Sequence, residues 1–197
     1  NGILLAYGAG HSVAGALEIT HRAGGFIASR NLKEPSAGMY ESVEGPGTVF
    51  AKRCDIREND ILFIISNSGR NPLGIDIALE AKNKGAKIVA VTSLEMSKEF
   101  SSKHSSGKRL FEVADYVLDN KVVSGDASIE VEGYDYKVCG MSTITTSILL
   151  QAVTYEAARL LVEQGIEPEI YRSQNEDGGR EYNEALEAKY VDRLSIM

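Results

Sequence analysis

Ile61-Leu62-Phe63-Ile64-Ile65, followed at once by Ser66-Asn67-Ser68-Gly69-Arg70-Asn71-Pro72, is the stretch that decides the fold of this 197-residue chain. Five apolar residues in a row that end at a turn predict a buried strand. Asn71 is a good N-cap and Pro72 suits the first helical position, so a helix should begin there. A buried strand that passes directly into a helix is typical of a βαβ unit, and such units build parallel sheets.

The same alternation of apolar runs and helical stretches recurs along the chain. Strands are predicted over residues 3–7, 25–28, 60–65, 87–92 and 116–118, and helices over residues 12–23, 48–53, 71–84 and 142–164. Residues 126–138 suggest an extra strand or hairpin, and the polar end of the chain suggests a short helix or a tail. Because a central strand begins at residue 3, we also expect that an N-terminal helix is missing from this sequence.

Composition excludes several classes of partner. Hydrophobic residues make up 43% of the chain and charged residues 25%, as in ordinary globular proteins, and the length suits one domain. The net charge of −7 comes without a basic stripe, so no nucleic-acid partner is expected. No stretch is long and apolar enough to predict a membrane span, and no secretory signal peptide is expected. Cys54 and Cys139 lack the spacing of a disulfide framework or a metal site, which predicts reduced thiols in the cytoplasm and no metal or other cofactor.

The turn after the 60–65 strand predicts an anion site. Backbone N–H groups at a helix start have no partner within the helix, and the helix dipole adds partial positive charge there. Ser66 and Ser68 would add two hydroxyl groups to this ring of amides. A phosphate monoester is the ligand that such a loop suits best, although one Ser-rich turn alone is more often only a well-capped connection.

The first predicted strand ends in a second small-residue loop, Gly8-Ala9-Gly10-His11-Ser12. As a dinucleotide-binding fingerprint this loop fails, because Val13 stands at the third glycine and no acidic residue follows the second strand. As an esterase nucleophile elbow it lies on the wrong strand, and no convincing acid and histidine follow in order. We prefer a third interpretation, in which the loop lets a sugar or a phosphate approach the backbone.

Together these two loops resemble the sugar isomerase (SIS) domain family. That family pairs a G-x-G-x-S loop, here Gly8, Gly10 and Ser12, with an S-x-S-G loop, here Ser66, Ser68 and Gly69. The resemblance implies a three-layer αβα sandwich with a five-stranded parallel sheet of the flavodoxin-like SIS fold, which binds a phosphosugar at the carboxyl ends of its strands. It also implies a homodimer or homotetramer, with the SIS domain over residues 1–172 and a tail or short helix over residues 173–197 that packs on the domain or on a neighbouring subunit.

The resemblance to a poorly characterised branch of single-domain bacterial proteins rests on four stretches: His11-Ser12, Arg22-Ala23-Gly24-Gly25, His104-Ser105-Ser106-Gly107-Lys108-Arg109-Leu110 and Asn175-Glu176-Asp177-Gly178-Gly179. Other motifs resemble related families. Thr92-Ser93 follows a strand where related domains carry a hydroxyl pair, and Gly140-Met141-Ser142-Thr143 resembles the G-S-T element of N-acetylmuramic acid 6-phosphate etherases. Glu18-Ile19-Thr20-His21-Arg22 resembles the E-L-T-G-R run of phosphoheptose isomerases, in which the glutamate performs acid–base work. His21 replaces the glycine of that run. Glu18 could equally pair with Arg22 on a solvated helix face.

The leading hypothesis is a metal-independent aldose–ketose sugar-phosphate isomerase or a related lyase that transfers a proton through an enediol. Glu18 and His104 are the predicted catalytic residues, although an exposed loop histidine is the commoner interpretation of His104. The residues predicted to hold the sugar and its phosphate are Gly8, Gly10, His11, Ser12, Ser66, Asn67, Ser68, Gly69, Asn71, Thr92, Ser93, Ser142 and Thr143. The alternative is a non-catalytic phosphosugar sensor that keeps the phosphate loop and leaves the acid–base pair idle.

Overall fold

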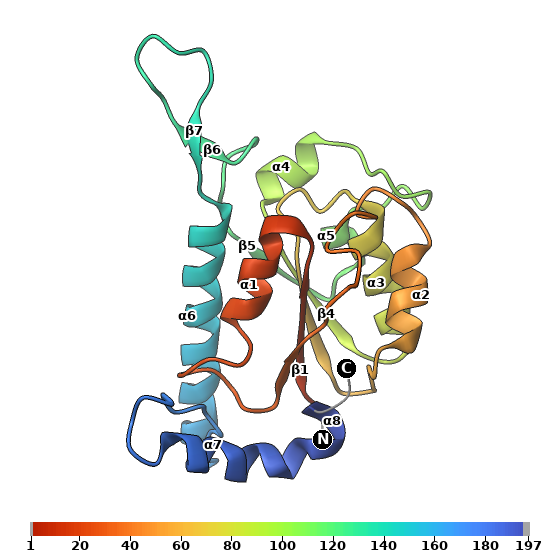
Figure 1. Ribbon diagram of the computed structural model, residues 1–197. Coiled ribbons are helices and arrows are strands. Elements are labelled where there is room, and N and C mark those ends of the chain that lie inside the picture. The colour runs from red at the N-terminus through yellow and green to blue at the C-terminus, as the bar shows by residue number, and fades with distance from the viewer. Residues whose placement is uncertain (1, 195–197) are drawn as a thin grey trace.

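A five-stranded parallel sheet in the order β2-β1-β3-β4-β5 forms the centre of the computed structural model, which describes residues 2–194 (Figure 1). Its strands are β1 (Leu4–Gly8), β2 (Ser29–Asn31), β3 (Ile61–Ile65), β4 (Lys87–Thr92) and β5 (Tyr116–Asp119). This order is that of flavodoxin-like folds. The predicted α/β class and the parallel sheet are confirmed, and the predicted boundaries of four strands agree with the structure to within one residue.

The second strand was placed too early, because β2 covers Ser29–Asn31 and, of residues 25–28, only Ala28 bonds to β1, by accepting from the N–H of Leu4 (2.8 Å). Ile27 instead donates its N–H to the carbonyl of Glu169 (3.0 Å), and Tyr171 donates to Gly25 (2.9 Å). Phe26 forms an antiparallel bridge with Ile170. A pairing with a segment more than 140 positions away leaves no trace in the local sequence, so the apolar run alone pointed to the wrong partner.

Helices cover both faces of the sheet. The helices that form cores with the sheet include α1 (Val13–Glu18), which follows a 3-10 turn η1 (Gly10–Ser12), α2 (Pro46–Arg53), α3 (Pro72–Asn83) and α6 (Ser142–Glu163). Leu62 and Ile64 of β3 belong to the core shared with α2 and α3, whereas Phe63 and Ile65 belong to the core shared with α1 and α6. Alternate residues of a strand point to opposite faces, which is why one apolar run serves two cores.

Further helices and turns complete the chain, and the sequence did not predict all of them. They are α4 (Leu94–Glu99), α5 (Leu110–Val113), α7 (Gly179–Glu187), the 3-10 turn η2 (Ala188–Tyr190) and α8 (Val191–Leu194). The helix predicted over residues 12–23 ends at Glu18, and His21 soon afterwards adopts a left-handed φ of +48°. Part of the tail predicted over residues 173–197, its last three residues, lies outside the described residues, as does residue 1.

The predicted hairpin is confirmed as an arm that projects beyond the body of the protein (Figure 1). It consists of β6 (Ala127–Ile129) and β7 (Val138–Gly140), which pair antiparallel. Its apolar side chains, such as Tyr134 and Tyr136, are exposed. Among the described helices, none combines the length and the apolar character that a membrane crossing requires.

Candidate functional site

The two loops singled out in the sequence lie at the carboxyl ends of the neighbouring strands β1 and β3. Gly8 ends β1, and a Cβ at this position would lie 2.3 Å from the Ser12 carbonyl oxygen, so only glycine lets the chain turn back this tightly. Gly10 has a left-handed φ of +54°. The loop then enters η1 and α1, which brings His11 and Ser12 to the edge of the sheet.

The loop after β3 offers unpaired donors. The N–H of Gly69 donates to Ser66 Oγ (3.2 Å), which closes the turn. The N–H groups of Asn67, Ser68, Arg70 and Asn71 form no hydrogen bond within the described part of the chain. The Ser68 hydroxyl also lacks a partner there. Four free amides at the start of a twelve-residue helix have the donor arrangement that binds an anion.

Asn71 occupies the N-cap position of α3 as predicted, but its side chain does not cap the helix. Its Nδ2 instead donates to Oε1 of Glu41 at 2.8 Å. The side chain therefore anchors the loop that precedes α2, and the part of Asn71 open to a ligand is its backbone N–H.

Thr92 and Ser93 lie at the end of β4, next to the loop that follows β3, and both side chains are fully buried. Thr92 Oγ1 donates to the carbonyl of Asn67 (3.0 Å) and lies 2.8 Å from Ser97 Oγ. Ser93 Oγ donates to the carbonyl of Val122 (2.5 Å). Gly69 completes the contact, since a Cβ there would lie 2.9 Å from Ser97 Oγ. Of the hydroxyl pair predicted to bind the ligand, Thr92 thus holds the loop after β3, whereas the Ser93 hydroxyl bonds to Val122 and caps α4.

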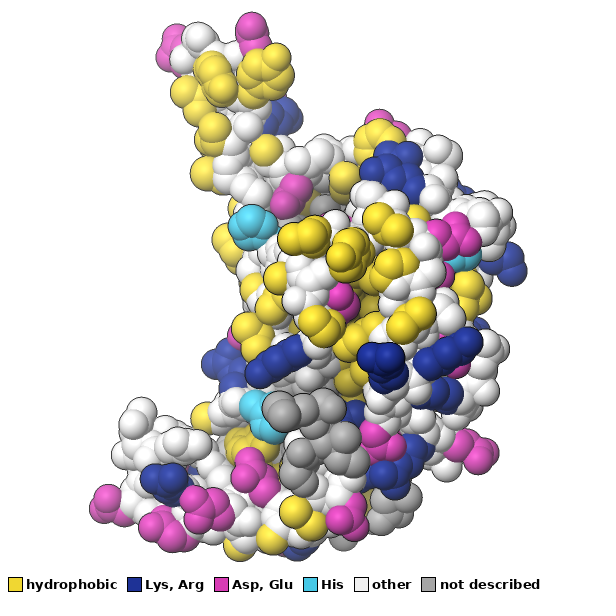
Figure 2. Space-filling model, turned by 45° about the vertical axis from the view of Figure 1, so that its right-hand side comes forward, with side chains coloured by type: hydrophobic (Ala, Val, Ile, Leu, Met, Phe, Trp, Pro, Cys, Tyr) yellow, Lys and Arg dark blue, Asp and Glu magenta, His cyan; other side chains and the backbone are white. Residues whose placement is uncertain are grey.

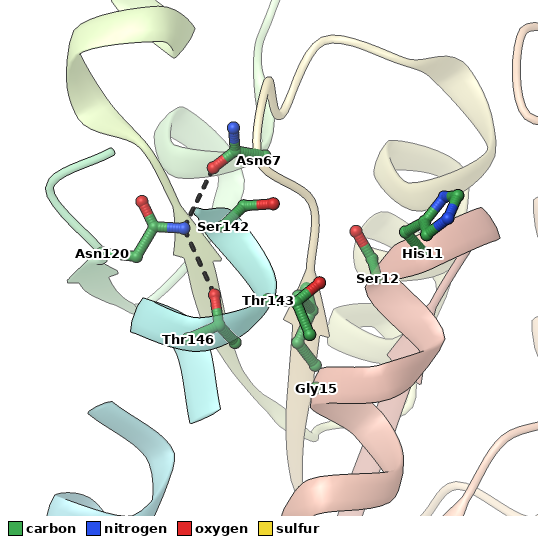
Figure 3. Close-up of a pocket in the computed structure, with 9 residues that line it drawn as sticks. His11, Ser12, Gly15, Asn67, Asn120, Ser142, Thr143 and Thr146 are labelled. Atoms are coloured by element: carbon green, nitrogen blue, oxygen red, sulfur yellow. Dashed lines mark hydrogen bonds between the residues drawn. The ribbon is translucent and has the colours of Figure 1, made fainter. Parts of the chain in front are cut away.

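A small pocket opens beside this loop, between the first turns of α1 and α6 (Figure 3). Asn120 Nδ2 donates to Asn67 Oδ1 (3.0 Å) and to Thr146 Oγ1 (3.2 Å), which ties β3, β5 and α6 together. The residues that line the pocket are His11, Ser12, Gly15, Ile65, Asn67, Asn120, Ser142, Thr143 and Thr146. Five of these nine were among the predicted site residues.

Four lining residues were missed by the sequence analysis. Asn120 follows the predicted strand 116–118, and a polar residue after a parallel strand was a usable signal. Gly15, Ile65 and Thr146 gave no such signal, because an apolar or small residue inside a strand or helix is normally part of the core. Asp126 was also missed, although it determines what the start of α6 can bind.

The start of α6 is already occupied by a carboxylate of the same chain. Asp126 Oδ1 accepts hydrogen bonds from the N–H groups of Met141 (2.9 Å) and Ser142 (2.7 Å), and its Oδ2 accepts from the Ser142 hydroxyl (2.8 Å). Ser142 is therefore committed to Asp126. Thr143 remains open, since its hydroxyl has no partner among the described residues, and Figure 3 shows it on the wall opposite Ser12.

The two predicted catalytic residues do not share a site within one subunit. Glu18 accepts a hydrogen bond from Gln151 Nε2 (2.8 Å) and pairs with Arg22, which places it between α1 and α6. His104 Nε2 lies 3.3 Å from Asp76 Oδ1 of α3, on the other face of the sheet. The sequence could not show this separation, because it does not reveal which face a helix covers.

His104 is a nearly buried part of the loop between α4 and α5. Its Nδ1 accepts from the N–H of Ser106 (3.1 Å), and Glu44 lies 3.7 Å from Nε2. Asp76 is buried as well and accepts from the N–H of Gly45 (2.6 Å). Lys103 in the same loop donates its N–H to the carbonyl of Arg70 (2.9 Å), so these contacts join the loop to the anion-binding turn.

The described residues contain no group of three His, Cys, Asp or Glu side chains placed to hold a metal ion.

Comparison with known proteins gives concordant matches. A family model described as the SIS domain matches residues 1–93. A UPF0309 protein of Listeria monocytogenes is 50% identical over 98% of this chain and 83% of its own length. A UPF0309 protein of Geobacillus thermodenitrificans is 40% identical over 100% of this chain and 82% of its own length.

Solved structures of low sequence identity share the fold. Phosphoheptose isomerase GmhA from Neisseria gonorrhoeae matches with a TM-score of 0.53 and 19% identity over 80% of this chain and 77% of that protein. A phosphoheptose isomerase from Francisella tularensis matches with a TM-score of 0.51 and 18% identity over 78% of this chain and 75% of that protein.

Proposed function

This chain belongs to the UPF0309 family and carries a SIS domain, and from that premise we propose that it binds a sugar phosphate and isomerises it through an enediol. The observation that carries the proposal is the row of four unpaired N–H groups in the loop after β3, beside a pocket of hydroxyl and amide groups. The phosphoheptose isomerases that share its fold support the class of ligand.

In this proposal the phosphate lies on the free amides of Asn67, Ser68, Arg70 and Asn71 and on the Ser68 hydroxyl. The dipole of α3 favours the negative charge there. The carbon chain extends into the pocket between α1 and α6, where Ser12 and Thr143 offer hydroxyl groups to the sugar. Fixing the phosphate sets the register of the carbon chain against the catalytic group.

His11 is the proton carrier that the pocket favours. It is the one residue with an ionisable side chain among the nine that line the pocket. Glu18 and His104, the predicted pair, are each bonded elsewhere and lie on opposite faces of the sheet. An imidazole beside the carbon chain can move a proton between two adjacent carbons, and such a group contributes roughly 10²–10⁴-fold to a rate.

The test begins with a thermal-shift screen of five-, six- and seven-carbon aldose and ketose phosphates, because a bound ligand raises the melting temperature. Hits are then incubated in D₂O with the wild type and with His11→Asn, Glu18→Gln and His104→Asn. We expect carbon-bound deuterium with the wild type and a loss of at least 100-fold with His11→Asn. Exchange that survives in His11→Asn but disappears in Glu18→Gln or His104→Asn would overturn the role given to His11.

A non-catalytic sensor is the second candidate, and one observation favours it. The carboxylate of Glu18 is held by Arg22 and Gln151, so the group expected to perform acid–base work is not free. A sensor would bind a hit from the screen and leave every carbon-bound proton in place over long incubation. That result would overturn the proposal that the protein is an isomerase, and it would support the proposal that the protein binds a sugar phosphate.

A further inference from the structure

A second, larger pocket lies at the β2 edge of the sheet, away from the strand-end loops. Its volume is about 580 Å³. The end of α2, the segment that follows β2 and the end of α8 form its walls. The residues that line it are His21, Arg30, Asn31, Leu32, Lys33, Pro35, Phe50, Arg53, Cys54, Asp55 and Leu194. None of them lines the pocket between α1 and α6.

This pocket contains basic side chains whose charge is not neutralised by an ion pair. Lys33 and Arg53 form no ion pair within the described part of the chain. Asp55, the one acidic lining residue, is already paired with Arg57 (2.7 Å) and Arg193 (2.9 Å). A basic pocket in a chain of net charge −7 is a local feature that selects for an anion. Figure 2 shows Lys and Arg side chains gathered beside apolar ones across the middle of one face.

His21 adds a positioned imidazole to the pocket. Its backbone φ of +48° is uncommon for a residue with a side chain and carries a conformational cost that glycine would avoid. The ring Nδ1 lies 3.0 Å from the hydroxyl of Tyr171, which itself donates to Glu187 Oε1 at 2.7 Å. Since the Tyr171 proton goes to Glu187, Nδ1 must donate, and Nε2 is the ring nitrogen left for a ligand.

We propose that this pocket is a ligand site for a small organic anion, with the charged group held by Lys33, Arg53 and His21. The apolar part of the ligand packs on Leu32 and Phe50. Burial, and to a lesser degree Lys33, lower the pKa of His21, while Glu187 opposes them. The imidazole is therefore neutral at pH 7 in the free protein, with a lone pair on Nε2. A bound anion should raise the pKa of His21, so that Nε2 takes up a proton from water and donates it to the charged group of the ligand.

Phenyl phosphate is a suitable probe, because it joins a phosphate to an apolar ring. NMR titration at pH 7 that follows the ring signals of His21 and Phe50 measures its affinity at this pocket, apart from any binding at the loop after β3, and the His21 signals report the His21 pKa. We expect an upward shift of that pKa on binding and at least a tenfold loss of affinity in Lys33→Gln/Arg53→Gln. Lys52→Gln removes a charge from the same helix outside the pocket and should leave the affinity unchanged.

His21→Asn is the second variant, because asparagine tolerates the left-handed backbone and removes the imidazole. It should fold normally and bind phenyl phosphate at least fivefold more weakly. The proposal is overturned if the His21 signals do not move, or if the double variant binds as the wild type does. Ser68→Ala, which changes the strand-end site, should leave this binding intact, so failure here is distinguishable from failure of the sugar-phosphate proposal.

Discussion

Substitutions at Thr92 and Ser68 should affect different properties of the loop after β3: Thr92→Val should lower stability, and Ser68→Ala should lower the affinity for a ligand. Thr92→Val keeps the shape of the side chain but removes the bond to the Asn67 carbonyl, so we expect a loss of about 1–2 kcal/mol in the free energy of unfolding. Ser68→Ala removes a hydroxyl that has no partner in the described chain and should change stability by less than about 0.5 kcal/mol. Urea denaturation measures both.

Titration with a sugar phosphate completes the comparison. Ser68→Ala should bind about five- to tenfold more weakly, because one hydrogen bond to a charged group is lost. An unchanged affinity in Ser68→Ala would argue that the phosphate does not lie in this loop.

Two helical glycines should respond in opposite ways to alanine. A Cβ at Gly15 would lie 2.9 Å from Thr146 Cγ2 and 3.2 Å from Ile65 Cγ1, so Gly15→Ala should push α1 and α6 apart and narrow the pocket. At Gly74 the nearest atom is Ile64 Cγ2 at 3.7 Å, an ordinary contact. Gly74→Ala should therefore stabilise α3 by about 0.5–1 kcal/mol, and Gly15→Ala should destabilise the protein and weaken sugar-phosphate binding. Thermal unfolding measures both effects. A melting temperature of Gly15→Ala above that of the wild type would contradict the close contact between α1 and α6 at Gly15.

For the helices and strands, the sequence predicted those elements whose boundaries are determined by neighbouring residues. The 60–65 strand and the helix after Asn71 follow from local apolar runs and capping residues. The second strand did not, because residues 25–27 pair with the distant segment 169–171 and β2 begins only at Ser29. The end of α1 was also missed, since no glycine or proline follows Glu18 before Gly24 and only the left-handed backbone of His21 shows that the helix stops.

Asp126 is expected to hold the arm formed by β6 and β7 against the start of α6. Its carboxylate accepts three hydrogen bonds, from Met141 and from the backbone and side chain of Ser142. Asp126→Ala should cost about 1–2 kcal/mol, as the loss of a helix cap does. Amide hydrogen exchange over residues 127–140 should accelerate. Asp135→Ala is the matched control, because Asp135 is exposed on the arm and its side chain forms no hydrogen bond or ion pair within the described chain, so it should change neither quantity.

For the molecule as a whole, the sequence brought the two small-residue loops to one edge of the sheet but could not place Glu18 and His104 relative to each other. Loops after parallel strands meet at one edge of the sheet whatever the details, so Ser12 and Asn67 could be brought together by inference. The faces that α1 and α3 cover depend on the handedness and order of the crossovers. The sequence analysis therefore assigned Glu18 and His104 to one catalytic site, although they contact helices on opposite faces of the sheet.

Arg193 links the end of the chain to the sheet and should make stability depend on pH. Its guanidinium bonds to Asp55 (2.9 Å) and to the fully buried Asp60 (2.7 Å). The hydrogen bond from Arg57, helped by Arg193, holds the pKa of Asp55 below its usual value. This contribution is fully present above the unfolded pKa near 4 and is lost as the pH falls through the lower folded value.

Arg193→Gln tests this link. It leaves Asp60 buried without its cation, so a loss of about 3 kcal/mol or more is expected at pH 7, together with a flatter decline in melting temperature between pH 5 and 3. Lys189→Gln, which removes the partly exposed pair with Glu169, should cost less than about 1 kcal/mol. A wild-type melting temperature that rises on acidification to pH 3 would contradict the sign argued here.

The outer face of α6 should be the contact between two copies of this chain. Ile144, Ile148 and Tyr155 are exposed by 53%, 66% and 65%, and no charged residue occurs between Ser142 and Tyr155. An uncharged apolar stripe of this kind is self-complementary, because a two-fold axis places the same residues on both sides and no like charges meet. A stable dimer needs about 800 Å² from each subunit, which an exposed face of a 22-residue helix together with the arm can supply.

Ile148→Asp should therefore convert a dimer into a monomer, as measured by light scattering after size-exclusion chromatography. Val49→Asp changes an apolar residue of similar exposure (57%) on α2 and should leave the dimer intact. Ile148→Asp should lower the melting temperature of the subunit by no more than the loss of the dimer explains. A wild type that stays monomeric at high concentration, or a variant that stays dimeric, would place the contact elsewhere.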